Sequence, residues 1–313
     1  MKLNLEELEV FDDLGQSDIY ESLIATKKPE NLFFFIKKTT KSNLSDEYKI
    51  KYFENELYFN ENFEHDNIIK YFGKKQILND TYLIFESANG GNLDDCFKTY
   101  IEKNKKPFSE EIVQNIISQV SAALKYLYDN HIVYRNLKLN HIYLEFDSEE
   151  DRSNMNLAKV KVKIGNFHFC KILGDKELAH SFIGTPVYMD PNILFLNEKN
   201  DVGYEYKADI WSLGTLCYEL LNGKTPFDGN DVDELVNNIK NEKYTIDKKL
   251  NLSKEAVSLI KGMLQYNPNK RLGIDDVIKH DFFKKKVNEL TYKGYEELGE
   301  VKENELILSI DIN

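Results

Sequence analysis

Two short segments carry the side chains with the clearest chemical meaning in this sequence. Residues 134–138 and 166–168 each place an amide, Asn136 and Asn166, among aromatic and basic residues. An amide nitrogen cannot accept a proton, and an amide oxygen is a far weaker base than a carboxylate. Mg²⁺ is a hard cation that prefers charged oxygen ligands. Both segments are therefore poorly suited to general-base chemistry or to magnesium binding.

The elements before these segments read mainly as strands. Residues 31–38 form a short apolar run flanked by polar residues, which suits a buried strand, and residues 81–85 predict another. Between them, residues 46–63 repeat apolar side chains at helical spacing, at Ile50, Phe53 and Leu57. The turn signal at residues 89–91 (Asn-Gly-Gly) marks the expected boundary between two lobes.

The elements after residue 91 read mainly as helices. Ser109 is a plausible N-cap, and a buried stripe follows it; the stripe consists of Ile112, Ile116, Val120, Leu124 and Leu127. A second apolar helix is expected over residues 209–221, ending at Asn222-Gly223, and Ser253 should cap a third. Residues 146–156 are acidic and polar, so we expect a solvated loop there.

Composition excludes several classes of function. The chain is 42% hydrophobic and 12% aromatic, which is ample for a globular core, and its net charge of −12 argues against nucleic acid and against an anionic membrane surface. Cys96, Cys170 and Cys217 lie far apart, so we expect them reduced and mostly buried. No apolar run approaches the ~18 residues of a membrane span. The first residues lack a signal pattern, and the expected location is the cytoplasm, with binding to a larger intracellular assembly left open.

Several motifs in order resemble the eukaryotic Ser/Thr protein kinases, over roughly residues 8–285. Residues 134–138 (Tyr-Arg-Asn-Leu-Lys) resemble H-R-D-L-K, residues 166–168 resemble D-F-G, and residues 184–192 resemble G-T-P-x-Y-M-A-P-E. The motif D-x-W-S-x-G is matched by residues 209–214, and residues 267–272 and 280–283 resemble the closing helices.

The resemblance implies an α+β bilobal fold, with a small antiparallel β-sheet lobe that carries one main helix and a larger, mostly helical lobe. Residues 1–88 would form the first lobe and residues 89–285 the second. A loop insertion is expected at about residues 146–158, and residues 286–313 would form a C-terminal extension.

The resemblance assigns the phosphate-binding residues. Lys37 fits the strand lysine that holds the α- and β-phosphates, and Glu56 fits its helical partner, with Glu54 as a weaker candidate. The glycine-rich loop is eroded, because only Gly15 remains, while Ser17 and Tyr20 replace the second and third glycines.

The resemblance also assigns the degraded catalytic positions. Asn136 replaces the Asp that accepts the substrate proton, Asn166 replaces a metal-binding Asp, and His141 replaces the Asn that binds a second metal. Imidazole suits Zn²⁺ better than Mg²⁺, but a lone His is more often a packing residue. Lys138 is retained and is the choice typical of Ser/Thr kinases.

The nucleotide pocket is expected to be closed by its own side chains. Phe35 takes the place of a small residue above adenine, and Tyr143 that of an aliphatic residue below it. The hypothesis is that the two rings touch and plug the pocket. The vestigial pocket would also include Phe85, Glu86 and Ala88.

Several positions are expected to serve regulation or assembly. Tyr71, Tyr134 and Phe167 can stack as an aromatic column anchored near Asp209. Ser181, Arg135 and Thr185 are regulatory candidates. A phosphoserine at position 181 would pair with Arg135, whereas the alternative at this position is an ordinary loop serine. Arg271 loses its usual carboxylate, because Asn192 stands there, which predicts a looser segment.

The leading interpretation of these losses is a pseudokinase that acts as a protein-binding scaffold or allosteric regulator without efficient phosphoryl transfer. One alternative is a low-activity or atypical ATP-dependent Ser/Thr kinase, and another is a structural component of a larger assembly. No cofactor is expected, and ATP with Mg²⁺ only under the enzymatic alternative. Protein partners would bind through the acidic loop, the activation segment or the C-terminal extension.

Overall fold

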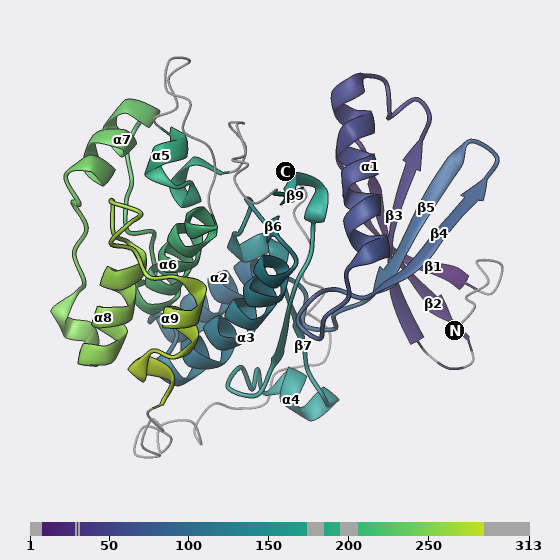
Figure 1. The fold of residues 1–313 in the computed structure, drawn as a ribbon. Coiled ribbons are helices and arrows are strands. Elements are labelled where there is room, and N and C mark those ends of the chain that lie inside the picture. Colours follow the sequence, from purple (N-terminus) through teal and green to yellow (C-terminus); the bar gives the residue numbers. More distant parts are fainter. Residues whose placement is uncertain (1–7, 29, 31, 174–184, 195–205, 285–313) are drawn as a thin grey trace.

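The chain folds into a smaller β-rich lobe and a larger, mainly helical lobe (Figure 1). A computed structural model describes residues 8–28, 30, 32–173, 185–194 and 206–284. The antiparallel sheet, its single long helix and the helical second lobe confirm the expected α+β bilobal architecture.

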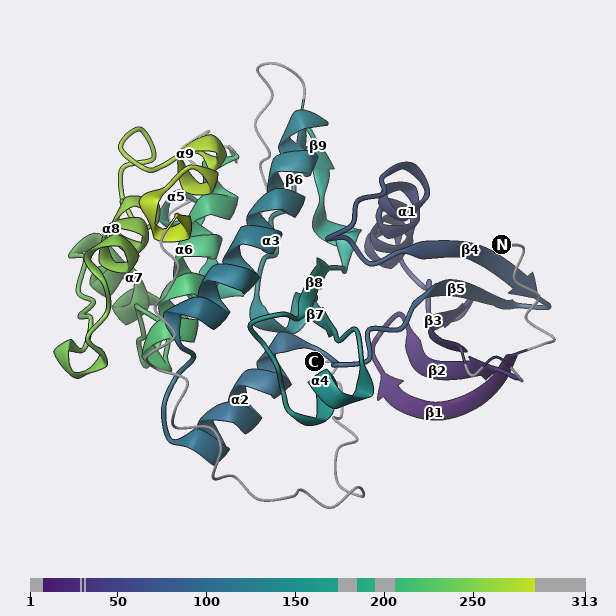
Figure 2. The ribbon, with the colours of Figure 1, turned by 90° about the horizontal axis from the view of Figure 1, so that it is seen from below.

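The small lobe is one antiparallel sheet with the strand order β1-β2-β3-β5-β4. Figure 2 shows the sheet as a curved layer with helix α1 on one side. The predicted strands at residues 31–38 and 81–85 correspond to β3 and β5. The elements of this lobe are β1 (Leu8–Gln16), β2 (Glu21–Lys27), β3 (Leu32–Thr40), α1 (Glu47–Asn62), β4 (Tyr71–Ile77) and β5 (Asp80–Glu86).

Helix α1 begins where the side chain of Asp46 accepts a hydrogen bond from the Lys49 amide at 2.9 Å. Of the apolar positions that predicted this helix, Phe53 and Leu57 pack against the core of the small lobe, whereas Ile50 is 40% exposed. The fully buried residues of α1 are instead Phe59 and the charged Glu56. The inner face of α1 therefore holds an ionic group as well as apolar side chains. For this reason the apolar residues of α1 do not by themselves mark its buried face in the sequence.

The large lobe is built around two central helices, α3 and α6, with short strands and smaller helices around them. Its helices are α2 (Leu93–Asn104), α3 (Glu110–Asp129), α4 (Glu149–Ser153), α5 (Pro191–Leu194), α6 (Lys207–Asn222), α7 (Val232–Lys240), α8 (Lys254–Met263) and α9 (Ile274–Ile278). Its strands are β6 (Ile132–Val133), β7 (Ile142–Glu145), β8 (Lys161–Ile164) and β9 (Lys171–Ile172).

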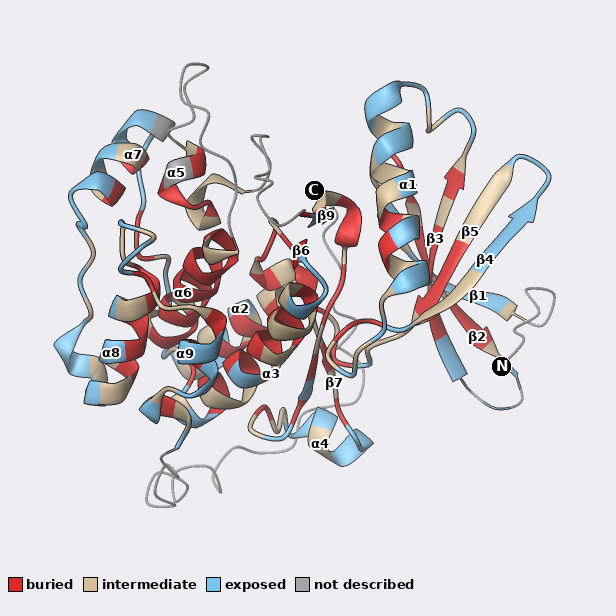
Figure 3. Cartoon of the chain, in the orientation of Figure 1, coloured by how far each residue is buried: buried red, intermediate tan, exposed pale blue. Residues whose placement is uncertain are grey.

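The sequence signals at helix ends work as expected in this lobe. Ser109 and Ser253 accept hydrogen bonds from the amides of the first turns of α3 and α8. Gly223 ends α6 with φ +80°, a left-handed conformation that favours glycine. The predicted stripe of α3 is entirely buried, and α6 is buried almost throughout (Figure 3).

The link between the lobes runs through residues 87–92, from the end of β5 to the start of α2. A Cβ atom added to Gly90 would lie 2.6 Å from the Phe146 ring and 2.8 Å from the Leu144 carbonyl oxygen. Real Cβ contacts are longer than this, so the linker can pack so closely against β7 only with glycine at this position.

The acidic segment that was expected to be a plain loop contains a short helix. Ser148 caps α4 by accepting a hydrogen bond from the Asp151 amide at 3.0 Å. Residues 147–150 and 152–154 are exposed as expected, whereas Phe146 is buried in the core. Cys96, Cys170 and Cys217 are buried and form no disulfide. Within the described parts of the chain, no helix combines the length and the apolar character needed to cross a membrane.

Candidate active site

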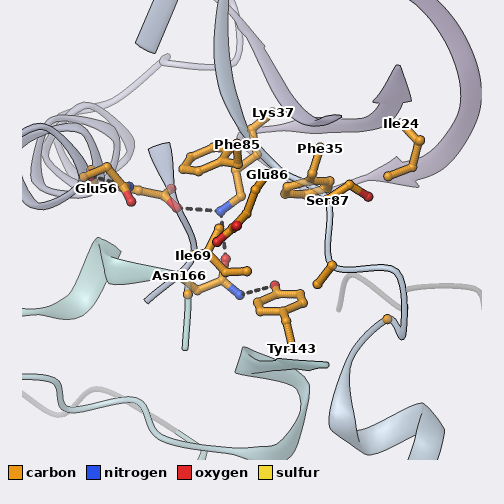
Figure 4. Close-up of a pocket in the computed structure, with 14 residues that line it drawn as sticks. Ile24, Phe35, Lys37, Glu56, Ile69, Phe85, Glu86, Ser87, Tyr143 and Asn166 are labelled. Carbon is orange, nitrogen blue, oxygen red and sulfur yellow. Dashed lines mark hydrogen bonds and ion pairs between the residues drawn. The ribbon is translucent and has the colours of Figure 1, made fainter. Parts of the chain in front are cut away.

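A pocket opens between the two lobes, below β3 and β5 and above β7 (Figure 4). The space in it that a water molecule can occupy is only about 50 Å³, so the pocket is narrow. The predicted residues that line it are Phe35, Lys37, Glu56, Phe85, Glu86, Ala88, Tyr143 and Asn166.

A chain of polar contacts crosses this pocket from α1 to the large lobe. The Lys37 amine on β3 donates to Glu56 Oε1 at 2.5 Å and to Asn166 Oδ1 at 2.7 Å. The Glu56 side chain is only 1% exposed, whereas Glu54 is exposed and takes no part. The structure thus brings together the expected lysine and glutamate, with the amide of Asn166 as a third member.

Asn166 uses both atoms of its amide in the pocket. Its nitrogen donates to the Tyr143 hydroxyl at 3.1 Å, while its oxygen accepts from Lys37. Burial raises the pKa of Tyr143 to about 12, although the hydrogen bond from Asn166 acts in the opposite direction. The backbone at Asn166 is left-handed, with φ 60°, a conformation that Asn tolerates better than most residues.

The segment around Asn136 lies outside the lining of this pocket, and so do Lys138 and His141. Asn136 is 7% exposed, and its carbonyl oxygen lies 2.9 Å from Nδ1 of His141. Burial lowers the pKa of His141 to about 3, and the amines of Lys138 and Lys37 add to this, so the imidazole is neutral at pH 7. Burial also lowers the pKa of the Lys138 amine, against the effect of the Asp94 carboxylate.

Asp209 on α6 fixes the backbone that leads into this segment. Its two carboxylate oxygens accept hydrogen bonds from the amides of Tyr134 and Arg135, both at 2.8 Å. Burial raises the pKa of Asp209 to about 6, and these two hydrogen bonds oppose the rise. The rings of Tyr134 and Phe167 are in contact, with centroids 5.6 Å apart, which forms part of the expected aromatic column.

The third member of that column packs elsewhere. The Tyr71 ring contacts Phe85 on β5, with centroids 5.3 Å apart, and no ring contact with Phe167 occurs among the described residues. Among the described residues, the predicted stack is therefore present only as the contact between Tyr134 and Phe167.

The loop that replaces a glycine-rich turn is closed on itself. The Ser17 amide donates to the Tyr20 carbonyl at 2.7 Å, and Ser17 Oγ accepts from the amides of Ile19 and Tyr20 at 3.4 and 3.0 Å. These amides are therefore occupied within the turn. Gly15 keeps a left-handed φ of +102°. Gly15, Ser17 and Tyr20 all lie outside the pocket lining.

Tyr20 turns toward α1 and joins the hydrophobic cluster of the small lobe. It is 4% exposed, and its ring centroid lies 6.3 Å from that of Tyr52 and 6.4 Å from that of Phe53. The Lys37 amine lies 5.1 Å from the centre of the Tyr20 ring. The large side chain is thus accommodated in the core and does not enter the nucleotide pocket.

Phe35 and Tyr143 lie on opposite walls of the pocket (Figure 4). The expected contact between them is wrong: the Phe35 ring packs against Phe85 at 6.1 Å, and no ring contact joins Phe35 to Tyr143 among the described residues. Gly165 explains how the lower wall is formed, because a Cβ atom at this position would lie 2.9 Å from the Tyr143 ring. The two rings narrow the pocket, and space remains between them.

Arg271 keeps a carboxylate partner, which corrects the expectation of a weak contact at Asn192. Its guanidinium forms a buried ion pair with Asp190, which lies two residues before Asn192 in the chain. The side chains of Arg271 and Asp190 are 0% and 3% exposed. The expected loosening of this segment is therefore not supported at residue 190. Thr185 precedes a short turn over Pro186–Tyr188, and Ser181 lies outside the described residues.

Two further residues hold the site together and were missed by the sequence analysis. Asn55 donates to backbone carbonyls of the segment that follows Asn166, and Tyr52 stacks on His168. Both lie on α1 within about one turn of Glu56. Their helical spacing from Glu56 is the one feature of the sequence that could have pointed to them. His168 is buried, and burial together with nearby His141 lowers its pKa well below the usual value.

The residues present do not fit a magnesium site. Both amide atoms of Asn166 are already paired, and Glu56 is held by Lys37. Over the described ranges, no group of three or more His, Cys, Asp or Glu side chains could hold a metal ion. An amide and an imidazole at the two expected metal positions are poor ligands for Mg²⁺.

The bilobal fold, the buried lysine–glutamate pair and the pocket beside it agree with the family that the motifs suggested. Residues 8–283 match the family described as "Protein kinase domain". The chain belongs to the protein kinase family.

Curated relatives carry Ser/Thr kinase names. The chain is 27% identical over 279 residues to the probable serine/threonine-protein kinase PLK of Dictyostelium discoideum, covering 89% of this chain and 26% of that protein. It is 30% identical over 234 residues to the probable cell cycle serine/threonine-protein kinase CDC5 homolog of Encephalitozoon cuniculi (strain GB-M1), covering 74% and 45%. Serine/threonine-protein kinase atg1 of Dictyostelium discoideum is 32% identical over 222 residues, covering 69% and 30%. The chain thus spans less than half the length of these relatives.

These matches correct the leading interpretation of the sequence. The expectation that the domain is not an enzyme is wrong, because the matched family is that of protein kinases and the relatives are named as Ser/Thr kinases. The amides at positions 136 and 166 alone therefore do not identify an inactive domain.

Proposed function

We propose that this chain is an ATP-dependent protein Ser/Thr kinase with low turnover. The observation that carries the proposal is the buried ion pair between Lys37 and Glu56, at 2.5 Å, which directs an amine into the pocket between the lobes. Lys138, two residues after Asn136, is the residue type usual in Ser/Thr kinases and supports the choice of substrate class, as do the names of the relatives.

The reaction can proceed with an amide at position 136 because phosphoryl transfer depends mostly on positioning and charge stabilisation. The bond from the γ-phosphorus to its bridging oxygen breaks, the substrate hydroxyl oxygen bonds to phosphorus, and ADP leaves. Asn136 can hold the hydroxyl by a hydrogen bond but cannot take its proton. The proton passes to an oxygen of the transferred phosphoryl group.

The expected rate is low for two reasons. A positioned general base is typically worth about 10²–10⁴ in rate, and this contribution is missing. In addition, the amides of Ser17, Ile19 and Tyr20 are paired within their own turn and must be released before they can contact phosphate.

The test is a transfer assay with radiolabelled ATP and generic protein substrates, followed by phosphoamino acid analysis. The Lys37→Ala variant should lose transfer, whereas Lys38→Ala should keep it. Lys38 is the neighbouring lysine of the same strand, and its amine pairs with Glu21 at 2.8 Å outside the pocket. Transfer that survives in Lys37→Ala, or is absent from the wild type, contradicts the proposal.

The expected protein partners and the expected compartment stay predictions. The roles of scaffold and of structural component are not proposed, because no contact among the described residues favours either of them over transfer.

A further inference from the structure

We infer that the cleft takes up ATP free of magnesium, with the amine of Lys37 compensating the phosphate charge. This inference rests on the proposed kinase function and deepens it, since it names the form of the nucleotide that the site accepts.

Asn166 gives the first reason. A magnesium site needs oxygen atoms with free lone pairs, preferably with full negative charge. The amide of Asn166 has one uncharged oxygen, and that oxygen already accepts from Lys37 at 2.7 Å. Its nitrogen is a donor, directed at the Tyr143 hydroxyl at 3.1 Å. A metal ion would have to displace Lys37 and would gain only a neutral ligand.

His141 gives the second reason, because it stands at the other expected metal position. Its Nδ1 atom lies 2.9 Å from the Asn136 carbonyl oxygen, so only Nε2 remains for another partner. Imidazole nitrogen suits zinc, copper or iron better than magnesium. The ring of His168 lies nearby, with centroids 6.0 Å apart, and adds a second imidazole but no carboxylate.

The charge balance of the cleft gives the third reason. The amines of Lys37 and Lys138 both act electrostatically on His141 and His168, and in each case they oppose a positive charge on the imidazole. The same potential opposes a divalent cation and attracts phosphate oxygens. The buried carboxylate that lines the pocket, Glu56, pairs with Lys37 through one of its two oxygens.

The direct test is calorimetric titration of the full chain with ATP, once with EDTA and once with excess Mg²⁺. Wild-type protein should bind ATP with EDTA present, and Mg²⁺ should not tighten the binding. The Asn166→Asp variant restores a carboxylate and should bind ATP more tightly with Mg²⁺ than with EDTA, by about tenfold, or about 1.4 kcal/mol. The matched control is Asn154→Asp, which adds the same charge at an exposed residue beyond α4 and should behave as the wild type.

The outcomes separate this inference from the proposed function. Binding by the wild type that requires Mg²⁺ overturns the inference, and a requirement for Mn²⁺ or Zn²⁺ overturns it too and would assign His141 and His168 as ligands. Metal-free ATP binding without phosphoryl transfer sustains the inference while the proposed function fails. No ATP binding under any condition removes both.

Discussion

The ring of Tyr52 stacks on the imidazole of His168, with centroids 3.9 Å apart and ring planes 15° apart. Three residues along the same helix, the Asn55 amide donates to the carbonyl oxygens of Phe167, His168 and Cys170, at 3.4, 2.6 and 2.9 Å. These contacts fasten α1 of the small lobe to the large lobe directly beside Asn166. They hold the next residue of α1, Glu56, in position to form its ion pair with Lys37.

Removing the contacts of Asn55 with the large lobe should destabilise the protein. The Asn55→Ala variant leaves buried carbonyl oxygens without their donor, which typically costs about 1–3 kcal/mol in the free energy of unfolding. Urea denaturation measures the change. Asn62→Ala is the control, since Asn62 is exposed and makes one bond, to the Tyr58 carbonyl. Equal stability of both variants would show that the fastening contributes little.

The ion pair between Arg271 and Asp190 should be essential to the large lobe. Asp190→Asn leaves a buried guanidinium without its counter-charge, and breaking such a pair costs about 3–5 kcal/mol. Thermal unfolding should shift strongly downward. Asp281→Asn, which removes an exposed pair with Lys284, should shift it little. A small shift for Asp190→Asn would mean that the guanidinium finds another acceptor.

Stability should fall on acidification because of the buried imidazoles. The pKa of His141 is about 3 in the folded chain and near 6.5 when unfolded, so between these values the unfolded state binds more protons. The free energy of unfolding should therefore decrease as pH falls from 6.5, by up to about 1.4 kcal/mol per pH unit for this group. The same direction holds for His168.

The midpoints of urea denaturation, measured across this pH range, test whether the buried imidazoles cause the loss of stability. His141→Asn should show a flatter profile than the wild type, whereas His131→Asn, which removes a histidine from the surface, should keep the wild-type slope. An unchanged slope in His141→Asn would exclude this residue as the source.

Opening the turn at Ser17 should strengthen nucleotide binding. Ser17→Gly removes the oxygen that accepts from the amides of Ile19 and Tyr20 and so frees these amides for phosphate. We expect a lower dissociation constant for ATP in a calorimetric titration. Ser45→Gly, at an exposed position before α1, serves as the control. Weaker binding by Ser17→Gly would indicate that the closed turn itself supports the pocket.

Restoring a carboxylate at position 136 should raise the rate of transfer. Asn136→Asp supplies the missing proton acceptor, and a positioned base is worth about 10²–10⁴ in rate. The radiolabelled assay described above, at saturating ATP, measures this change. A rate that does not rise would place the slow step outside proton transfer.

Much of the fold could be predicted from the sequence because its signals are local. The caps at Ser109 and Ser253, the buried stripe of α3 and the helix stop at Gly223 all depend on residues close together in the chain. The pairing of Lys37 with Glu56 followed from a resemblance in which both positions are fixed by their elements.

The remainder depends on which surfaces meet. Position in a motif made Asn192 the expected partner of Arg271, but the structure supplies the charge from Asp190. Tyr20 replaces a glycine of the eroded loop, yet the small lobe has room for its ring between the sheet and α1. The role of Asn55 requires knowing that α1 packs on residues 167–170, and no local pattern states this.

The contacts of Asn55 with the large lobe also limit how a nucleotide can enter and leave the pocket. Swinging the lobes apart would break the bonds of Asn55 and unstack Tyr52 from His168 in a single event, so a wide hinge motion is disfavoured. We expect exchange to proceed instead by local fluctuation of the turn at residues 17–20, while α1 stays in contact with the large lobe.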